Sequence, residues 1–364
     1  MPFIHVIIPC YNVDKYLEQA VYSVLNQPYK NIDIVLVDDG SPGRTPQLCD
    51  ELAAKEPRVH VIHKENGGLS DARNAGIEYA LANLLHGGRE FIGFLDGDDI
   101  WAPGVLNEKV AEHLRTDWNE DVIGFTGVLG NNSLTRYSGK LSQLEKSGVS
   151  AREMMWASCA VTVAAKLYSV HVFQKWNVRF QYKQLYTEDK IFLIQFYFLA
   201  DTARFVNKTL HVYRKNRTGI MGSLQKLTAA GHYLPIVEGW LKCDEFLNEL
   251  TDRTHTVAQM GQTLAAIYLV EMVAVQMKKW GSFQEIMEIF RSHPHYPATE
   301  SGELVKPNDR EYAVNRMLFE HPLKFRLKYR LIGAVEWVLW KLLAIPAVAA
   351  LWEKKRYPFT QIPN

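Results

Sequence analysis

Short apolar runs of strand length alternate with longer segments of helical periodicity through the first part of the chain. The runs are rich in Val and Ile and are mostly apolar. Strands that are apolar on both faces are typical of a parallel sheet covered by helices on each side. The expected strands are Phe3–Pro9, Asp33–Asp38, Val59–His63 and Phe91–Leu95, and the expected helices are Lys15–Asn26, Pro46–Glu56, Ser70–His86 and Pro103–Leu114. This order predicts an α/β fold with a mostly parallel, Rossmann-like sheet.

The pattern becomes mixed after this first sheet and then helical. The mixed part predicts strands at Val122–Val128 and Thr209–Arg214 and a helix at Glu188–Leu199. Beyond about Leu224 the periodicity is helical, as in Val257–Lys279, and no strand is expected before the chain ends. The length of 364 residues exceeds what one core usually serves, which favours a second, helical region after the α/β domain.

Composition and charge exclude several classes of protein. Hydrophobic residues make up 47% of the chain and charged residues 22%, as in ordered globular proteins. Lys and Arg together number 41 against 40 Asp and Glu, so no overall basic field favours nucleic acid binding. The cysteines are scattered and the first residues lack the features of a signal peptide, which favours a reducing, cytoplasmic location. These cysteines are Cys10, Cys49, Cys159 and Cys243.

Polar and acidic residues follow the expected strands, where parallel sheets bind their ligands. The strand ends are Pro9–Asn12, Asp38–Ser41, Lys64–Asn66 and Asp96–Asp99. A dinucleotide site would need a G-x-G-x-x-G turn after the first strand, and a P-loop would need its lysine motif. Neither motif is present there, which leaves a nucleotide site built from carboxylates.

Three carboxylates, Asp96, Asp98 and Asp99, come directly after a buried strand. An Asp-x-Asp pair can hold a hard divalent cation, Mn²⁺ or Mg²⁺, that bridges phosphate oxygens. The same pair taken alone is as compatible with a solvated turn. Asp99 has a further alternative role, which is to cap the helix expected from Pro103.

Five sequence segments, in a fixed order along the chain, favour a metal site over a solvated turn at Asp96–Asp99. They are VIIPCYN at Val6–Asn12, VDDGS at Val37–Ser41, ENGGLSDARNAGI at Glu65–Ile77, LDGDD at Leu95–Asp99 and TED at Thr187–Asp189. In this combination the chain resembles the family 2 glycosyltransferases of the GT-A fold, of the bacterial surface-polysaccharide type. The resemblance implies transfer of a sugar, with inversion, from a nucleoside diphosphate sugar, usually a UDP-sugar, to a hydroxyl of a glycan or lipid-linked acceptor.

The resemblance assigns the nucleotide pocket residue by residue. It implies that Asp39 accepts a hydrogen bond from the base and that Pro9 and Tyr11 shape the same pocket, while Asp38 is mainly structural. It places Arg73 near the nucleotide. The alternative for Arg73 is an ion pair on a helix surface.

The resemblance also assigns the chemistry. Asp96 would face the ribose or the metal, Asp98 would bind the metal directly, and Asp189 would be the catalytic base. Glu188 cannot point the same way as its neighbour on a helix, so it is expected to orient the site.

The segment HVYRKNRTGIMGS at His211–Ser223 resembles the flexible closing segment of the family. Arg214 and Arg217 would contact the diphosphate, because a guanidinium fork suits phosphate oxygens. His211 is either a ligand of the metal or phosphate or a satisfied structural histidine.

Other classes of function remain as alternatives. A nucleotidyltransferase would carry a Gly-rich phosphate loop and a reactive lysine near its first strand, and the chain has neither there. A non-catalytic nucleotide-sugar-binding or scaffold protein would be expected to lack the base or the metal carboxylates, and all are present. A retaining mechanism would need a second nucleophilic carboxylate, which the resemblance does not indicate.

The chain ends in a basic, amphipathic segment. Lys324, Arg326, Lys328 and Arg330 precede the apolar stretch Leu331–Trp352, which Lys354, Lys355 and Arg356 follow. Basic flanks and tryptophans favour a peripheral anchor on a membrane surface, and Glu336, Lys341 and Pro346 argue against a simple span. The alternative is a helix packed on the catalytic domain or on a second subunit of a homo-oligomer. The expected domains are therefore a GT-A catalytic domain at 1–222, a helical region at 223–322 and the tail at 323–364.

Overall fold

The computed structural model describes residues 2–107, 121–130, 135–136, 149–150, 162–181 and 188–214, together with residues 324, 327, 328 and 331. The chain divides into two compact units, Met1–Asn216 and Arg217–Asn364. Among the described residues, no helix is both long and apolar enough to cross a bilayer. Most of the predicted helical region and tail lies outside the described residues, so the domain boundaries at 222 and 322 stay predictions.

The first part of the α/β domain has the predicted order of strands and helices. Its strands β1, β2, β3 and β4 pair in parallel in the order β3-β2-β1-β4, with Val6 opposite both Ile34 and Gly93. The elements are β1 (Phe3–Cys10), α1 (Leu17–Leu25), β2 (Ile32–Asp39), α2 (Thr45–Lys55), β3 (Val59–Lys64), α3 (Leu69–Asn83) and β4 (Glu90–Phe94). The predicted Rossmann-like sheet is confirmed.

The second part of the sheet contains a reversed strand that the sequence pattern did not predict. Its path continues as β4-β9-β6-β10-β5, where β9 is antiparallel to both of its neighbours and β6 is parallel to β10. The elements are β5 (Ile100–Trp101), β6 (Val122–Gly130), β7 (Thr135–Arg136), β8 (Val149–Ser150), η2 (Val163–Ala165), β9 (Lys166–Ser169), α6 (Val170–Trp176), α7 (Glu188–Leu199) and β10 (Thr202–Arg214). Strands β1 to β4, β6 and β10 therefore all end at the same edge.

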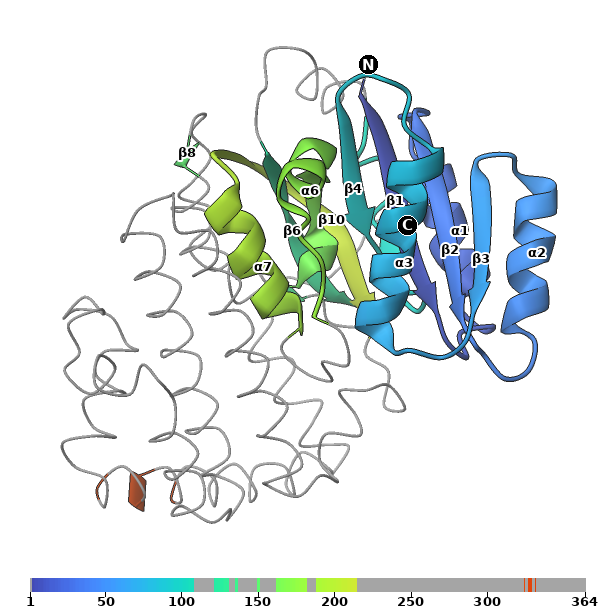
Figure 1. Ribbon diagram of the computed structural model, residues 1–364. Helices are drawn as coiled ribbons and strands as arrows, with labels where there is room; N and C mark the ends of the chain where they lie inside the picture. The colour runs from blue at the N-terminus through green and yellow to red at the C-terminus, as the bar shows by residue number, and fades with distance from the viewer. Residues whose placement is uncertain are drawn as a thin grey trace. The chain divides into compact units, whose positions relative to one another are not determined.

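Helices cover both faces of this sheet, as Figure 1 shows. Ile4, Val6 and Ile8 of β1 are buried in one core with residues of α1 and α2. Ile7, which alternates with them, faces α3 instead. A Cβ at Gly76 would lie 2.4 Å from Ile7 Cγ2. This glycine lets α3 pack closely on the strands.

An aromatic cluster fills the same face of the sheet farther along. The ring of Phe94 on β4 makes edge contacts with Phe180 and Phe192, and Tyr168 of β9 makes one with Phe196 of α7. Aromatic rings favour such edge contacts, and each ring buries a large apolar area. The cluster holds the start of α7 beside the first turns of α3, where Arg73 contacts Asp189.

The helix predicted from Pro103 to Leu114 is wrong in its described part. Residues 103–107 form a turn and a bend, and Gly104 has φ +68°, which a right-handed helix does not allow. The rest of that segment lies outside the described residues.

Candidate active site

The functional residues gather at one edge of the sheet because of its topology. The loops after β2 and β4 lie at the carboxyl ends of parallel strands, and so does the end of β10. Because β9 runs in the opposite direction, its beginning lies at this same edge. Thr162 and η2 therefore join the site although they precede a strand.

Arg73 joins two parts of the site that are far apart in the sequence. Its Nη1 donates to Asp189 Oδ1 at 2.6 Å and its Nη2 donates to Asp96 Oδ1 at 2.8 Å. The side chain of Arg73 is only 1% exposed. Burial alone would lower the pKa of Arg73, but the charges of Asp189, Asp96 and Glu188 raise it. The guanidinium is therefore a fixed positive charge between the proposed base and the predicted metal loop.

Arg73 is not in a surface ion pair, which was the alternative to a place near the nucleotide. Its Nε has no hydrogen-bond partner among the described residues, and its Cζ lies 5.1 Å from the centre of the Phe180 ring. Asn74 holds that ring in place. Its Oδ1 accepts from Phe180 N and its Nδ2 donates to Phe180 O, both at 2.8 Å.

Asp189, at the first turn of α7, is held by more than Arg73. Its Oδ2 accepts from Thr162 Oγ1 at 3.0 Å and from Val163 N at 3.2 Å. The side chain is 23% exposed. Three donors therefore hold this carboxylate: the guanidinium of Arg73, the hydroxyl of Thr162 and the backbone N–H of Val163.

Glu188 lies near Arg73, although it was expected to point away from its neighbour Asp189 on the helix. Its Oε1 is 3.7 Å from Arg73 Nη1, and its side chain is 15% exposed. Burial and the neighbouring charge of Asp189 raise the pKa of Glu188 to about 8. The two neighbouring acids thus share one guanidinium, and Glu188 holds a proton at pH 7.

Asp39 fastens the turn that precedes α3. Its Oδ1 accepts from Lys64 Nζ at 2.7 Å and from Gly67 N at 2.9 Å, and its Oδ2 accepts from Gly68 N at 2.8 Å. Gly68 has φ +88°, a conformation that favours glycine. The carboxylate of Asp39 is therefore fixed before any ligand arrives, and its contact with a base stays a prediction.

The end of β1 and the loop after it contact the loop after β2, because Asn12 N donates to Ser41 Oγ at 3.3 Å and Ser41 Oγ donates to Cys10 O at 3.2 Å. Asp38 accepts from Ser41 N at 3.0 Å and pairs with His63 at 3.0 Å, which agrees with its predicted structural role. Tyr11 is 54% exposed. The exposed ring of Tyr11 is available to a ligand, and Pro9 is buried in β1 behind it.

Asp99 does not cap a helix at Pro103 but joins β10 to the loop after β4. Its Oδ2 lies 2.8 Å from His211 Nε2, and its Oδ1 accepts from Arg214 N at 2.7 Å. Both side chains of the Asp99–His211 pair are at most 1% exposed, and burial raises the pKa of Asp99. His211 Nε2 is thus occupied by Asp99, which favours the structural alternative for this histidine.

Arg214 braces the same loop. Its Nε donates to Asp98 O and its Nη2 donates to Gln19 Oε1, both at 2.7 Å, and its Cζ lies 4.9 Å from the centre of the Tyr16 ring. Its contact with a diphosphate stays a prediction. Arg217 lies outside the described residues.

Known proteins that are similar to this chain are glycosyltransferases. The sequence model described as Glycosyl transferase family 2 matches residues 5–176. Glycosyltransferase GlyG of Streptococcus pneumoniae is 30% identical over 231 residues, which cover 60% of this chain and 72% of GlyG. The chain belongs to glycosyltransferase family 2.

Other members of the family are longer than the part they share with this chain. The uncharacterized glycosyltransferase EpsJ of Bacillus subtilis is 29% identical over 224 residues, which cover 59% of this chain. The match spans 62% of EpsJ and 35% of the glycosyltransferase GlyA of S. pneumoniae. Among solved structures, residues 1–349 of S. aureus TarS in complex with UDP align with a TM-score of 0.61 at 16% identity, covering 100% of this chain and 94% of that one. This likeness supports the GT-A fold.

The residues after β4 fit a divalent metal whose remaining coordination positions would be filled by substrate oxygens and water. Among the described residues, no three His, Cys, Asp or Glu side chains gather closely enough to enclose a cation. Asp96 and Asp98 follow one strand at the site edge, and Asp96 is 30% exposed. One or two carboxylates with phosphate oxygens and water are the usual set for Mg²⁺.

Several residues of this family 2 site were not found from the sequence. Thr162, Val163 and Phe180 lie outside the recognised segments, and Lys64 and Asn74 lie in or beside them without an assigned role. The sequence signal for the last two was their place directly before and within the segment Glu65–Ile77.

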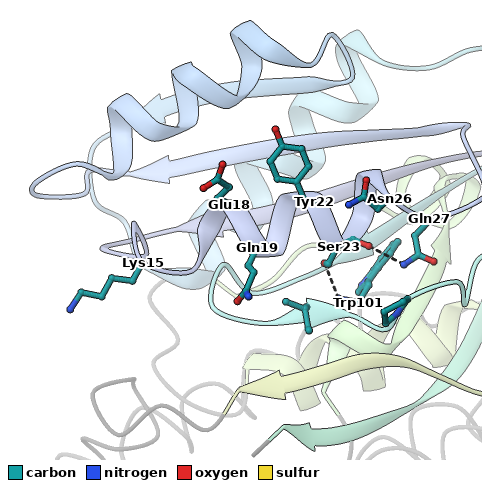
Figure 2. A pocket seen from close by; sticks show the side chains of 10 residues that line it. Lys15, Glu18, Gln19, Tyr22, Ser23, Asn26, Gln27 and Trp101 are labelled. Atoms are coloured by element: carbon teal, nitrogen blue, oxygen red, sulfur yellow. Dashed lines mark hydrogen bonds between the residues drawn. The ribbon is translucent and has the colours of Figure 1, made fainter. Parts of the chain in front are cut away.

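A separate hollow of about 590 Å³ lies between α1 and β5. Figure 2 shows Glu18, Gln19 and Tyr22 projecting from α1 at this hollow, and Ser23 bonded to Trp101. Gln19 also accepts from Arg214, so one end of the hollow is close to the loop after β4. The carboxylates of the site do not line it.

Proposed function

We propose that this chain transfers a sugar, with inversion, from a nucleoside diphosphate sugar to a hydroxyl of a glycan or lipid-linked acceptor. The observation that carries the proposal is the bridge that Arg73 makes between Asp96 and Asp189. The buried guanidinium binds Asp96 through one terminal nitrogen and Asp189 through the other. In the proposed reaction Asp96 belongs to the donor side and Asp189 to the acceptor side. Preorganised charges of this kind are a main source of catalysis.

The proposed donor is a UDP-sugar. TarS was solved with UDP and with UDP-GlcNAc, and those structures share the fold of this chain. Asp39 and the exposed ring of Tyr11 lie at neighbouring strand ends and are the proposed contacts of the base. A divalent cation held by Asp98 and Asp96 would supply positive charge beside the diphosphate.

The proposed chemistry is a single displacement. Asp189 takes the proton of the acceptor hydroxyl, and the oxygen forms a bond to the anomeric carbon. The bond from that carbon to the phosphate oxygen breaks, and its electron pair leaves with the nucleoside diphosphate. Attack from the face opposite to the leaving group inverts the configuration.

Nucleotide release from a donor panel tests this proposal. The panel is UDP-N-acetylglucosamine, UDP-glucose, UDP-galactose and GDP-mannose, each with Mn²⁺ and with water as the acceptor. Asp189→Asn is expected to reduce kcat by about 10² to 10⁴ and to leave UDP affinity nearly unchanged in calorimetry. Asp98→Asn is expected to remove the dependence of UDP binding on Mn²⁺.

The outcomes separate the proposal from its alternatives. Binding of UDP without release from any donor would favour a non-catalytic nucleotide-sugar-binding or scaffold protein. Wild-type release by Asp189→Asn would place the base elsewhere.

The proposed location is the cytoplasmic face of a membrane, with the tail as a peripheral anchor. In the short described part of the tail, Leu327 and Leu331 are helical and 70% and 66% exposed. Lys324 and Lys328, one turn apart, are also exposed. Exposed leucines beside lysines are typical of a helix that lies on an anionic lipid surface.

A further inference from the structure

Thr162 is the residue before η2 and touches Asp189 through its side chain. We infer that Thr162 is a positioning residue that fixes the rotation of the Asp189 carboxylate, so that Oδ1 is the atom that takes the acceptor proton. This inference rests on the proposed role of Asp189 as the base.

The direction of the hydroxyl proton follows from its neighbours. Thr162 Oγ1 accepts from Ala164 N at 3.2 Å and lies 3.0 Å from Asp189 Oδ2. A hydroxyl has one hydrogen and two lone pairs, and an ionised carboxylate can only accept. The hydrogen of Thr162 therefore points to Asp189.

The backbone that carries this hydroxyl is anchored to the sheet. Lys166 Nζ donates to Thr162 O at 2.8 Å, and Tyr168 OH donates to Val163 O at 3.1 Å. Lys166 and Tyr168 belong to β9 and are 2% and 0% exposed. A donor whose backbone is anchored to buried residues of a strand can hold a carboxylate in one orientation, whereas the terminal torsion of aspartate is otherwise broad.

The acceptor sites that the hydrogen bonds leave unused on the Asp189 carboxylate indicate which oxygen takes the proton. Each carboxylate oxygen offers about two acceptor sites. Oδ2 accepts from Thr162 and from Val163 N, while Oδ1 accepts from Arg73 among the described residues. Within the part of the chain that the structure describes, Oδ1 therefore keeps a free acceptor site, and the bond to Thr162 keeps the carboxylate from exchanging its two oxygens.

Thr162→Val tests this role because it removes the hydroxyl and keeps the branched shape. With the fastest donor of the panel and Mn²⁺, kcat for nucleotide release is expected to fall about tenfold or more, as for loss of a hydrogen bond to a charged group. The affinity for UDP is expected to stay unchanged. Thr162→Ser is expected to restore kcat.

A double-mutant cycle separates this role from a loss of stability. If Thr162 acts through the carboxylate, Thr162→Val is expected to have no further effect on kcat in the Asp189→Asn background. Thr45→Val is the matched control, because Thr45 is a buried threonine whose hydroxyl, like that of Thr162, accepts from a backbone N–H, here that of Val13. Any effect of that variant is expected to be the same in both backgrounds.

Three results would overturn the inference. They are a wild-type kcat for Thr162→Val, an equal loss of kcat in both backgrounds, and no recovery with Thr162→Ser. If Thr162→Val loses its thermal transition, Thr162→Ala is measured in the same cycle. If Asp189→Asn itself keeps the wild-type rate, Asp189 is not the base and the proposed mechanism is wrong. This result differs from the three that would overturn only the role of Thr162.

Discussion

Replacing Glu188 with glutamine tests the electrostatics of the site most directly. Its carboxyl group is 15% exposed and lies next to Asp189, and burial with that neighbouring charge raises its pKa to about 8. The ordinary value is 4.5. Between these values the folded protein holds a proton that the unfolded chain releases, so its stability falls as pH rises. Above pH 8 both states are ionised and this loss is complete.

The size of the effect follows from the width of this window. Each unit of pKa difference corresponds to about 1.4 kcal/mol. Between pH 5 and pH 7 the wild type is expected to lose about 2 to 3 kcal/mol of unfolding free energy relative to Glu188→Gln. Residual exposure and the charge of Arg73 reduce this figure. A neutral amide resembles the protonated carboxyl, so activity at pH 7 is expected to stay within a few fold.

Urea unfolding at pH 5, 6, 7 and 8 measures this difference. Glu18→Gln, at the hollow beside α1, is the control for the loss of one negative charge. The urea midpoints of wild type and Glu188→Gln are expected to diverge with rising pH, while those of Glu18→Gln stay parallel to wild type. Parallel curves for all three proteins would refute a raised pKa of Glu188. A loss of activity as large as that of Asp189→Asn would refute its protonation at pH 7.

Three further predictions concern packing, the nucleotide and the tail. Gly76→Ala is expected to destabilise the fold by about 1 to 3 kcal/mol in thermal or urea unfolding, because its Cβ would meet Ile7 at 2.4 Å; an unchanged midpoint would contradict the close packing of α3. Asp39→Ala is expected to weaken UDP binding in calorimetry while the dependence on Mn²⁺ remains, and equal losses for all nucleotides would count against a contact with the base. Truncation before Leu323 is expected to release the protein from anionic vesicles in flotation and to leave nucleotide release largely intact. Aggregation of the truncated protein would mean that the tail belongs to the fold.

The first part of the fold could be predicted because each strand is marked locally. In β1 and β2 nearly every position is buried and most are apolar, and each strand is followed by a complete helix. The second part depends on contacts between distant segments. Strand β9 is only the four residues KLYS, and its pairing with β4 and β6 decides its direction. No local pattern in four residues carries that information.

The candidate site was also only partly predictable from the sequence. The acidic segments were found because they follow strands in a recognisable order, but the partners of these acids were not. Arg73 and Asp189 are 116 positions apart, and Thr162 reaches Asp189 only because β9 is reversed. A carboxylate in a sequence motif identifies a chemical group, whereas its hydrogen-bond donors depend on the tertiary structure.

The position of Arg73 shows how packing on α3 determines the chemistry. Gly76, almost one turn later on the helix, lets α3 approach β1, and this approach buries Arg73 at the sheet edge. A buried cation requires paired anions, because an unpaired charge is strongly disfavoured in the interior. Asp96 supplies one of them from the loop after β4, and Asp189 supplies another from the first turn of α7. A change in charge beside Asp96 therefore alters the field that Asp189 experiences through one shared guanidinium, and binding of the proposed metal and diphosphate would be such a change.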